Sequence, residues 1–227
     1  MPALRLPRIA VALGFETPEK LFEHACREVE QGETFLEFRL DYLADPQQGV
    51  ALIRRFLDEN RECVVLATCR RRQNHGRFNG SLEEQIRILE RAVEAGARAV
   101  DVEIESAEAQ PQALGGLRDR AMLVLSYHHF EGTPPLEPVL RRLTRVPADL
   151  YKIVTTARKP SDNYRVLALA KEHPRVPMVV LAMGQTGFPS RVLGPIFGSR
   201  YTYAAPSAAE GTAAGQVCAG QLRRLFR

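Results

Sequence analysis

The chain has 227 residues, of which 45% are apolar and 26% are charged, so it can bury the core of a globular domain. No apolar run approaches the roughly 18 residues that a membrane helix needs, and the N-terminus shows no signal-peptide cleavage pattern. We therefore expect a cytoplasmic protein without a membrane partner. The net charge of +4 does not by itself distinguish between a nucleic-acid partner, an anionic substrate and an arginine-rich surface.

Cysteine usage points away from disulfides and metal. The chain has four cysteines, at positions 26, 63, 69 and 218, and none forms a C-x-x-C pair. Such spacing is typical of reduced core thiols rather than of a disulfide framework or a zinc site. We predict no metal site.

Apolar runs typical of β-strands alternate with helix-like stretches along the whole chain. The helices over 17–31, 81–95 and 161–173 have clear ends, including a capping-box spacing from Ser81 to Glu84 and glycines at 32 and 96. Regular alternation without a linker predicts a single-domain (β/α)8 TIM barrel over residues 1–227, with an open doubly wound sheet as the alternative. The eight expected strands lie near 8–14, 34–43, 63–70, 99–105, 122–128, 149–155, 178–184 and 200–205.

Charges alternate with apolar residues in the second expected strand. Glu37, Arg39 and Asp41 share one face, and leucine and phenylalanine occupy the other. A half-exposed antiparallel strand would explain this pattern. In a parallel sheet covered by helices, however, both faces are enclosed, and the charges then need partners or a ligand. We favour the second interpretation.

The same alternation directs Arg70, His128 and Lys152 to the barrel interior, with Arg70 and His128 at the strand ends where barrel enzymes place their chemistry. Of the four lysines, only Lys152 lies in an apolar strand. Enclosure favours the neutral, nucleophilic form of an amine, and a histidine nearby can act as a base next to a lysine imine. The alternative for Lys152 is a structural ion pair with Asp101 or Glu103.

Two other stretches carry weaker signals. The arginine-rich residues 70–78 could contact nucleic acid, but no helix-turn-helix, zinc-finger or RNP pattern accompanies them. The glycines between 184 and 198 match neither a Walker A nor a dinucleotide fingerprint. We expect a solvated loop at 70–78 and no nucleic-acid partner.

Taken together, six ordered segments resemble the type I 3-dehydroquinate dehydratases over about residues 34–225. The segments are Glu-Phe-Arg-Leu-Asp at 37–41, Thr-Cys-Arg at 68–70, Ser-Tyr-His-His-Phe at 126–130, Tyr-Lys-Ile at 151–153, Met-Gly-Gln-Thr-Gly through Ser-Arg at 183–191, and Gly-Gln at 215–216.

The resemblance implies a TIM-barrel lyase of the shikimate pathway that converts 3-dehydroquinate to 3-dehydroshikimate by syn elimination. It implies that Lys152 forms a Schiff base with the substrate and that His128 is the general acid and base. The resemblance implies a homodimer, and it implies no metal or diffusible cofactor. The residues expected to bind substrate are Glu37, Arg39 and Arg70 at the ring hydroxyls, Arg191 and Gln216 at the carboxylate, and Thr212 at a position usually held by serine.

One departure from the family pattern affects the histidine. Four residues after Arg70 the family usually has a glutamate that pairs with the histidine, followed by two glycines, whereas this chain has Asn74, His75 and Gly76. We expect Asn74 or Glu103 to take over the contact to His128. Two other functions stay open from the sequence: a class I aldolase-like barrel, and a non-catalytic ligand sensor.

Overall fold

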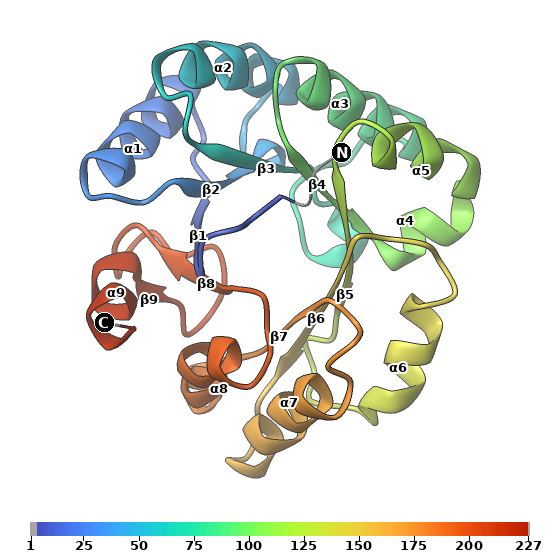
Figure 1. The fold of residues 1–227 in the computed structure, drawn as a ribbon. Helices are drawn as coiled ribbons and strands as arrows, with labels where there is room; N and C mark the ends of the chain where they lie inside the picture. Colours follow the sequence, from blue (N-terminus) through green and yellow to red (C-terminus); the bar gives the residue numbers. More distant parts are fainter. Residues whose placement is uncertain (1–3, 227) are drawn as a thin grey trace.

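The computed structural model describes residues 4–226, so the outermost residues of the predicted 1–227 domain lie outside this range. The described residues form one sheet of nine strands, and every strand pair is parallel. Figure 1 shows the sheet curling on itself into a barrel. The strands are β1 (Ile9–Leu13), β2 (Phe35–Arg39), β3 (Val64–Thr68), β4 (Ala99–Glu103), β5 (Met122–His128), β6 (Leu150–Thr156), β7 (Met178–Met183), β8 (Thr202–Ala205) and β9 (Val217–Cys218).

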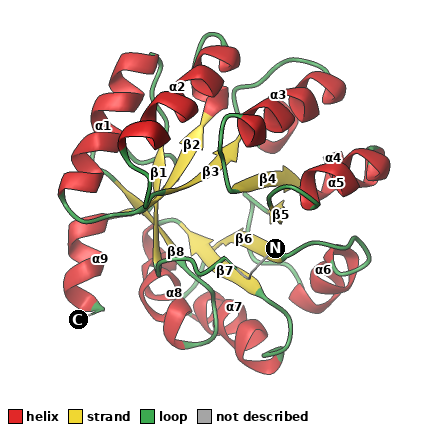
Figure 2. Ribbon diagram, turned by 45° about the horizontal axis from the view of Figure 1, so that its top comes forward, coloured by secondary structure: helices red, strands yellow, loops and turns green. Residues whose placement is uncertain are grey.

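Helices cover the outside of the barrel between successive strands (Figure 2). They are α1 (Pro18–Glu30), α2 (Pro46–Glu59), α3 (Leu82–Glu94), α4 (Ile104–Ala109), α5 (Pro111–Arg118), α6 (Leu136–Leu143), α7 (Ser161–Glu172), α8 (Phe188–Leu193) and α9 (Ala219–Leu225). This arrangement confirms the predicted (β/α)8 TIM-barrel class over the open doubly wound sheet. The predicted capping box of α3 is also confirmed, since Ser81 and Glu84 each bond the other's backbone N–H.

The strand order is β7-β6-β5-β4-β3-β2-β1-β8-β9, so β7 ends the ladder on one side. On this side, the backbone groups of β7 are paired by neighbouring segments instead of by a continuous strand. The N–H groups of Val180 and Ala182 donate to the hydroxyls of Ser199 and Ser190, and Arg200 N–H donates to the Met178 carbonyl. These bonds satisfy the edge where the barrel closes.

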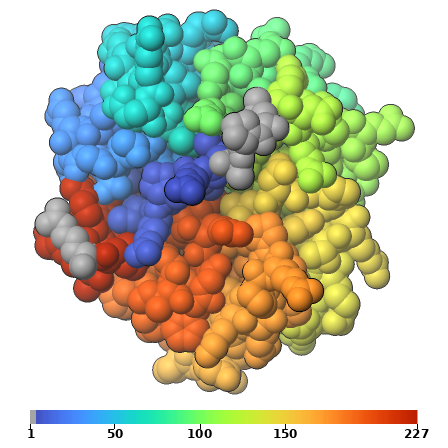
Figure 3. All heavy atoms as spheres, in the orientation of Figure 1, coloured from blue at the N-terminus to red at the C-terminus, as the bar shows by residue number. Residues whose placement is uncertain are grey.

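Strand residues alternate between two apolar clusters. Ile9, Val11 and Leu13 pack outward beneath the helices, whereas Ala10 and Ala12 pack with the interior cluster. The interior is filled at its amino end by apolar side chains, including Leu4 and Leu6 of the N-terminal segment. Figure 3 shows this segment lying over the middle of that face. Polar side chains of the interior are therefore expected at the carboxyl ends of the strands.

Several expected strands end earlier than predicted. The second stops at Arg39, whose φ of −83° and ψ of 83° leave strand geometry, and Leu40–Tyr42 form a 3-10 turn. The fourth stops at Glu103, because α4 begins at Ile104 without a loop. The alternation of apolar and charged residues continues across both boundaries, so the sequence pattern did not mark them. Among the described residues, no helix combines the length and apolar character that crossing a bilayer requires.

Candidate active site

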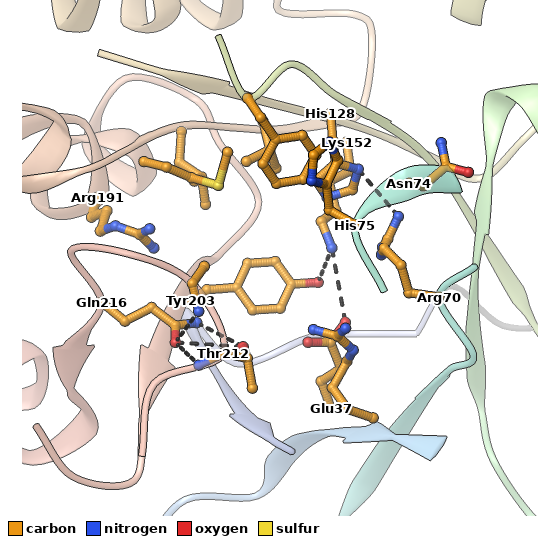
Figure 4. A pocket seen from close by; sticks show the side chains of 16 residues that line it. Glu37, Arg70, Asn74, His75, His128, Lys152, Arg191, Tyr203, Thr212 and Gln216 are labelled. Atoms are coloured by element: carbon orange, nitrogen blue, oxygen red, sulfur yellow. Dashed lines mark hydrogen bonds and ion pairs between the residues drawn. The ribbon is translucent and has the colours of Figure 1, made fainter. Parts of the chain in front are cut away.

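A cavity opens at the carboxyl ends of the strands (Figure 4). All of the residues predicted to bind or act on substrate line it, although they come from positions as far apart as 37 and 216. They are Glu37, Arg39, Arg70, His128, Lys152, Arg191, Thr212 and Gln216. Each of these side chains either points inward from a strand or lies on a segment that follows a strand at the same rim, so closure of the barrel brings them together.

Lys152 lies in the centre of β6 and is 4% exposed. Its Nζ donates to Asp101 Oδ2 at 2.9 Å and to the Tyr203 hydroxyl at 2.9 Å, and it lies 3.8 Å from Glu37 Oε1. The sequence alternative of an ion pair with Asp101 is thus correct, and the partner is not Glu103. The pairing does not remove Lys152 from the cavity, since its side chain also lines the wall.

Asp101 connects two cations at the floor of the site. It accepts from Arg70 Nη2 at 2.7 Å and from the Ser126 hydroxyl at 2.7 Å, in addition to Lys152. Burial disfavours its charged form, but Arg70 and Lys152 outweigh burial and hold the pKa of Asp101 well below its usual range. Asp101 therefore stays ionised and acts as a fixed counter-ion rather than as a proton acceptor.

His128 ends β5 and receives a hydrogen bond from Arg70, with Nη1 3.1 Å from the ring Nδ1. A guanidinium only donates, so Nδ1 must be the acceptor, and the neutral ring carries its proton on Nε2. Burial, together with the charges of Arg70 and Lys152, holds the pKa of His128 well below its ordinary value. The ring is therefore neutral at neutral pH.

The prediction that Asn74 or Glu103 contacts His128 is wrong. The Asn74 amide donates to Glu105 at 2.9 Å, and Glu103 accepts from Gln85 at 2.7 Å and from the Arg71 backbone at 3.1 Å. The 3-10 turn over Arg72–Asn74 brings Asn74 against the first turn of α4. Arg70, a cation, takes the contact to His128 in place of a carboxylate.

Arg191 projects from the short helix α8 and is 1% exposed. Its Nη2 donates to the Ala214 carbonyl at 3.1 Å, and its Nε has no partner. Within residues 4–226 no carboxylate lies within ion-pair distance of it, and burial lowers the pKa of Arg191 to about 10. A buried cation without a counter-ion is costly, which suits a site whose anion arrives with the ligand.

Thr212 and Gln216 belong to the loop between β8 and β9 and are bonded to each other. Gln216 Oε1 accepts from the Thr212 N–H at 2.7 Å, and Gln216 Nε2 lies 3.3 Å from the Thr212 hydroxyl. Ala214 in the same loop accepts from both Arg191 and the Gly184 N–H. These bonds hold the loop over Arg191, on one side of the cavity.

Glu37 and Arg39 occupy the opposite side. Glu37 accepts from the Thr68 hydroxyl at 2.7 Å, and Arg39 donates through Nε and Nη2 to both oxygens of Asp41 at 2.9 and 2.8 Å. Asp41 was predicted to share the inner face with Glu37 and Arg39, but it lies beyond the end of β2 in the 3-10 turn and does not line the cavity. Both side chains are thereby oriented by the protein before any ligand binds.

Two polar residues of the cavity wall, Tyr203 and His75, were not predicted from the sequence as parts of the site. Tyr203 lies on β8 next to Lys152, and the shared parity of Tyr201 and Tyr203 was the available signal. His75 adopts the left-handed conformation with φ 59°, and its ring packs 3.8 Å from that of Phe130 between centroids. Positive φ is uncommon for residues other than glycine, so the sequence carried only a weak signal for this conformation at His75.

Comparisons with known proteins agree with this geometry. The family model described as Type I 3-dehydroquinase matches residues 9–227. The 3-dehydroquinate dehydratase of Dehalococcoides mccartyi is 36% identical over 200 residues, covering 87% of this chain and 86% of the relative. That of Desulfotalea psychrophila is 34% identical over 226 residues, covering 96% of each chain.

A solved structure shows the same fold. The 3-dehydroquinate dehydratase of Geobacillus kaustophilus superposes with a TM-score of 0.89 at 26% identity, covering 97% of this chain and 90% of its own. These matches cover most of this chain and most of each relative. By sequence and by structure, the chain belongs to the type I 3-dehydroquinase family.

Proposed function

We propose that this protein is a 3-dehydroquinate dehydratase that forms an imine between Lys152 and the ketone of 3-dehydroquinate and eliminates water in the syn sense to give 3-dehydroshikimate. The observation that carries the proposal is the position of Lys152 and His128 in one cavity with Arg191, a buried cation lacking a counter-ion. The substrate has the matching groups: a ketone, ring hydroxyls and a carboxylate.

The lysine supplies the electron sink. Neutral Nζ attacks the ketone carbon, and loss of water leaves a cationic imine that acidifies the adjacent C–H group. Asp101 and Glu37, at 2.9 and 3.8 Å from Nζ, stabilise this cation by their charge. Because the imine accepts the electron pair, we propose that neither a metal nor a diffusible cofactor takes part.

His128 then moves the proton. In the substrate-free site its Nδ1 lone pair is occupied by Arg70, so removal of a proton by Nδ1 requires Arg70 to find another acceptor. Substrate ring hydroxyls near Arg70 and Glu37 provide one. His128 takes the proton next to the imine and returns it to the departing hydroxyl, which leaves as water, and hydrolysis of the imine releases the product.

Borohydride trapping tests this proposal. The purified protein is mixed with 3-dehydroquinate, reduced, digested and examined by peptide mass spectrometry while enone absorbance is followed. We expect a product-mass adduct on Lys152 and rising absorbance. A folded protein that gives neither would support the ligand sensor instead, and cleavage of a carbon–carbon bond would support the aldolase-like alternative.

Arg191 gives a second test. Replacing Arg191 with methionine removes the proposed carboxylate partner, and we expect kcat/KM to fall by roughly 10- to 150-fold, the range for losing a hydrogen-bonded charge pair. Steady-state kinetics should place most of the change in KM, because the carboxylate does not react. The matched control is Arg200→Met, since Arg200 is exposed and lies outside the cavity. An unchanged KM in Arg191→Met would contradict the assignment.

We also propose that the protein forms a homodimer, as the family resemblance implies. The neighbouring helices α7 and α8 (Figure 2) provide a candidate surface, because Tyr164 on α7 and Ile196 after α8 are 74% and 69% exposed. Light scattering on a gel-filtration column measures the mass, and a monomer at micromolar concentration would contradict the proposal.

A further inference from the structure

The Tyr203 hydroxyl is one of two groups that receive a hydrogen bond from the Lys152 amine. Its Oη lies 2.9 Å from Nζ, and Nζ also lies 4.3 Å from the centroid of the Tyr203 ring. Tyr203 is 4% exposed and lines the cavity beside Lys152 (Figure 4). A group in this position touches the atom that forms the new bond.

The other neighbours of Nζ are poor partners for proton exchange. Asp101 is held ionised by Arg70 and Lys152, so it does not accept a proton readily. Glu37 lies farther away, at 3.8 Å, and already accepts from the Thr68 hydroxyl. Among the residues that the structure describes, Tyr203 is therefore the neutral hydroxyl within hydrogen-bond distance of the amine.

Attack on a ketone requires a proton to change atoms. As the C–N bond forms, the carbonyl π electrons move to oxygen, the nitrogen becomes cationic, and one proton must pass from nitrogen to oxygen to give the neutral carbinolamine. The two atoms are bonded to the same carbon. A hydroxyl that accepts from the nitrogen can thus donate its own proton to the oxygen.

We propose that the Tyr203 hydroxyl relays this proton, accepting one from Lys152 Nζ while giving its own to the substrate oxygen, so that it is unchanged at the end of the step. The inference rests on the proposed imine at Lys152 and adds a catalytic residue to it. Burial and the Glu37 carboxylate raise the pKa of Tyr203 well above its usual value. A phenolate is therefore costly, and the exchange proceeds without forming one.

The test replaces Tyr203 with phenylalanine, which removes a single oxygen. Rapid mixing with 3-dehydroquinate and quenching in borohydride at successive times gives the rate at which Lys152 is trapped. We expect this rate to fall roughly 10- to 100-fold, as for loss of a hydrogen bond to a developing charge. If imine formation becomes rate-limiting, the kinetic isotope effect on kcat must also fall towards one when the substrate carries deuterium on the carbon from which His128 removes the proton.

Tyr201→Phe is the matched control. Tyr201 directly precedes β8, is fully buried, and contacts Tyr203 through hydroxyls 3.4 Å apart, but no bond joins it to Lys152. Lys152 of the Tyr201→Phe variant should be trapped at nearly the wild-type rate. Equal slowing in both variants would assign the effect to packing of the tyrosine pair and overturn the inference.

The outcomes separate this inference from the proposed function. A wild-type protein that is never trapped at Lys152 contradicts the imine itself. A wild-type protein trapped normally, with Tyr203→Phe trapped equally fast, contradicts only the relay. If Tyr203→Phe does not fold, wild-type trapping in mixtures of H2O and D2O decides: a relay moves two protons and gives a curved dependence on deuterium fraction, whereas a linear dependence overturns it.

Discussion

Replacing Lys152 with methionine is expected to lower kcat by at least about 10⁴-fold, comparable to the loss of other covalent nucleophiles. Methionine fills much of the same space in β6 but provides no amine to form the imine. Without the imine, no electron sink acidifies the substrate C–H group. This group then remains a weak acid, which His128 deprotonates only slowly. Continuous measurement of enone absorbance gives kcat directly.

The substitution should leave the fold intact. Asp101 keeps its bonds to Arg70 and to the Ser126 hydroxyl, and Glu37 keeps its bond to Thr68. We therefore expect a loss of about 1–3 kcal/mol in unfolding free energy, measured in urea, rather than the larger cost of an isolated buried charge. Lys171→Met, at an exposed position of α7, is the control. Residual activity within tenfold of wild type in the Lys152 variant would exclude covalent catalysis.

The sequence predicted the barrel and its interior because parity is a local property. Once β2 and β6 are parallel strands with helices outside, the inward direction of Glu37 and Lys152 follows from alternation alone. Caps were predictable for the same reason, since Ser81 and Glu84 lie within one turn. Strand ends were not, because Leu40 and Ile104 continue the alternation of apolar and charged residues after the backbone has turned.

Contacts among charged side chains were less predictable. Asp101 had two cations within reach, and both Arg70 and Lys152 bind it. The contact from Arg70 to His128, and the bond from Asn74 to Glu105, depend on the turn after β3, whose left-handed residue is His75 and not a glycine. Family resemblance identified the polar residues that line the cavity, whereas their hydrogen-bond and ion-pair partners depend on the three-dimensional arrangement of the loops.

Replacing His128 with asparagine is expected to lower kcat by about 10²–10⁴-fold, the usual contribution of a general acid and base. The asparagine oxygen can still accept from Arg70, so the site keeps its geometry, but the side chain cannot carry a proton. Imine formation should survive, because Lys152 and its neighbours are untouched. Mass spectrometry after borohydride should then show an adduct heavier by one water than the product adduct.

The pH dependence separates the base from a merely structural histidine. Since the folded pKa of His128 lies below its ordinary value of about 6.5, the neutral base persists to below that pH, and kcat/KM should fall only in more acidic solution. The unfolded chain, in contrast, binds a proton near pH 6.5. Stability from His128 is therefore present above pH 6.5 and is lost as pH falls towards the folded pKa.

His128→Asn lacks this titration, so the difference in unfolding free energy between the wild type and this variant should shrink as pH falls below about 6.5. Substituting Arg70 provides the complementary test. Arg70→Met removes the nearest cation from Nδ1, so the pKa of His128 should rise and the acidic limb of the kcat/KM profile should move to higher pH. An acidic limb that stays in place would show that Arg70 does not set the charge state of the base.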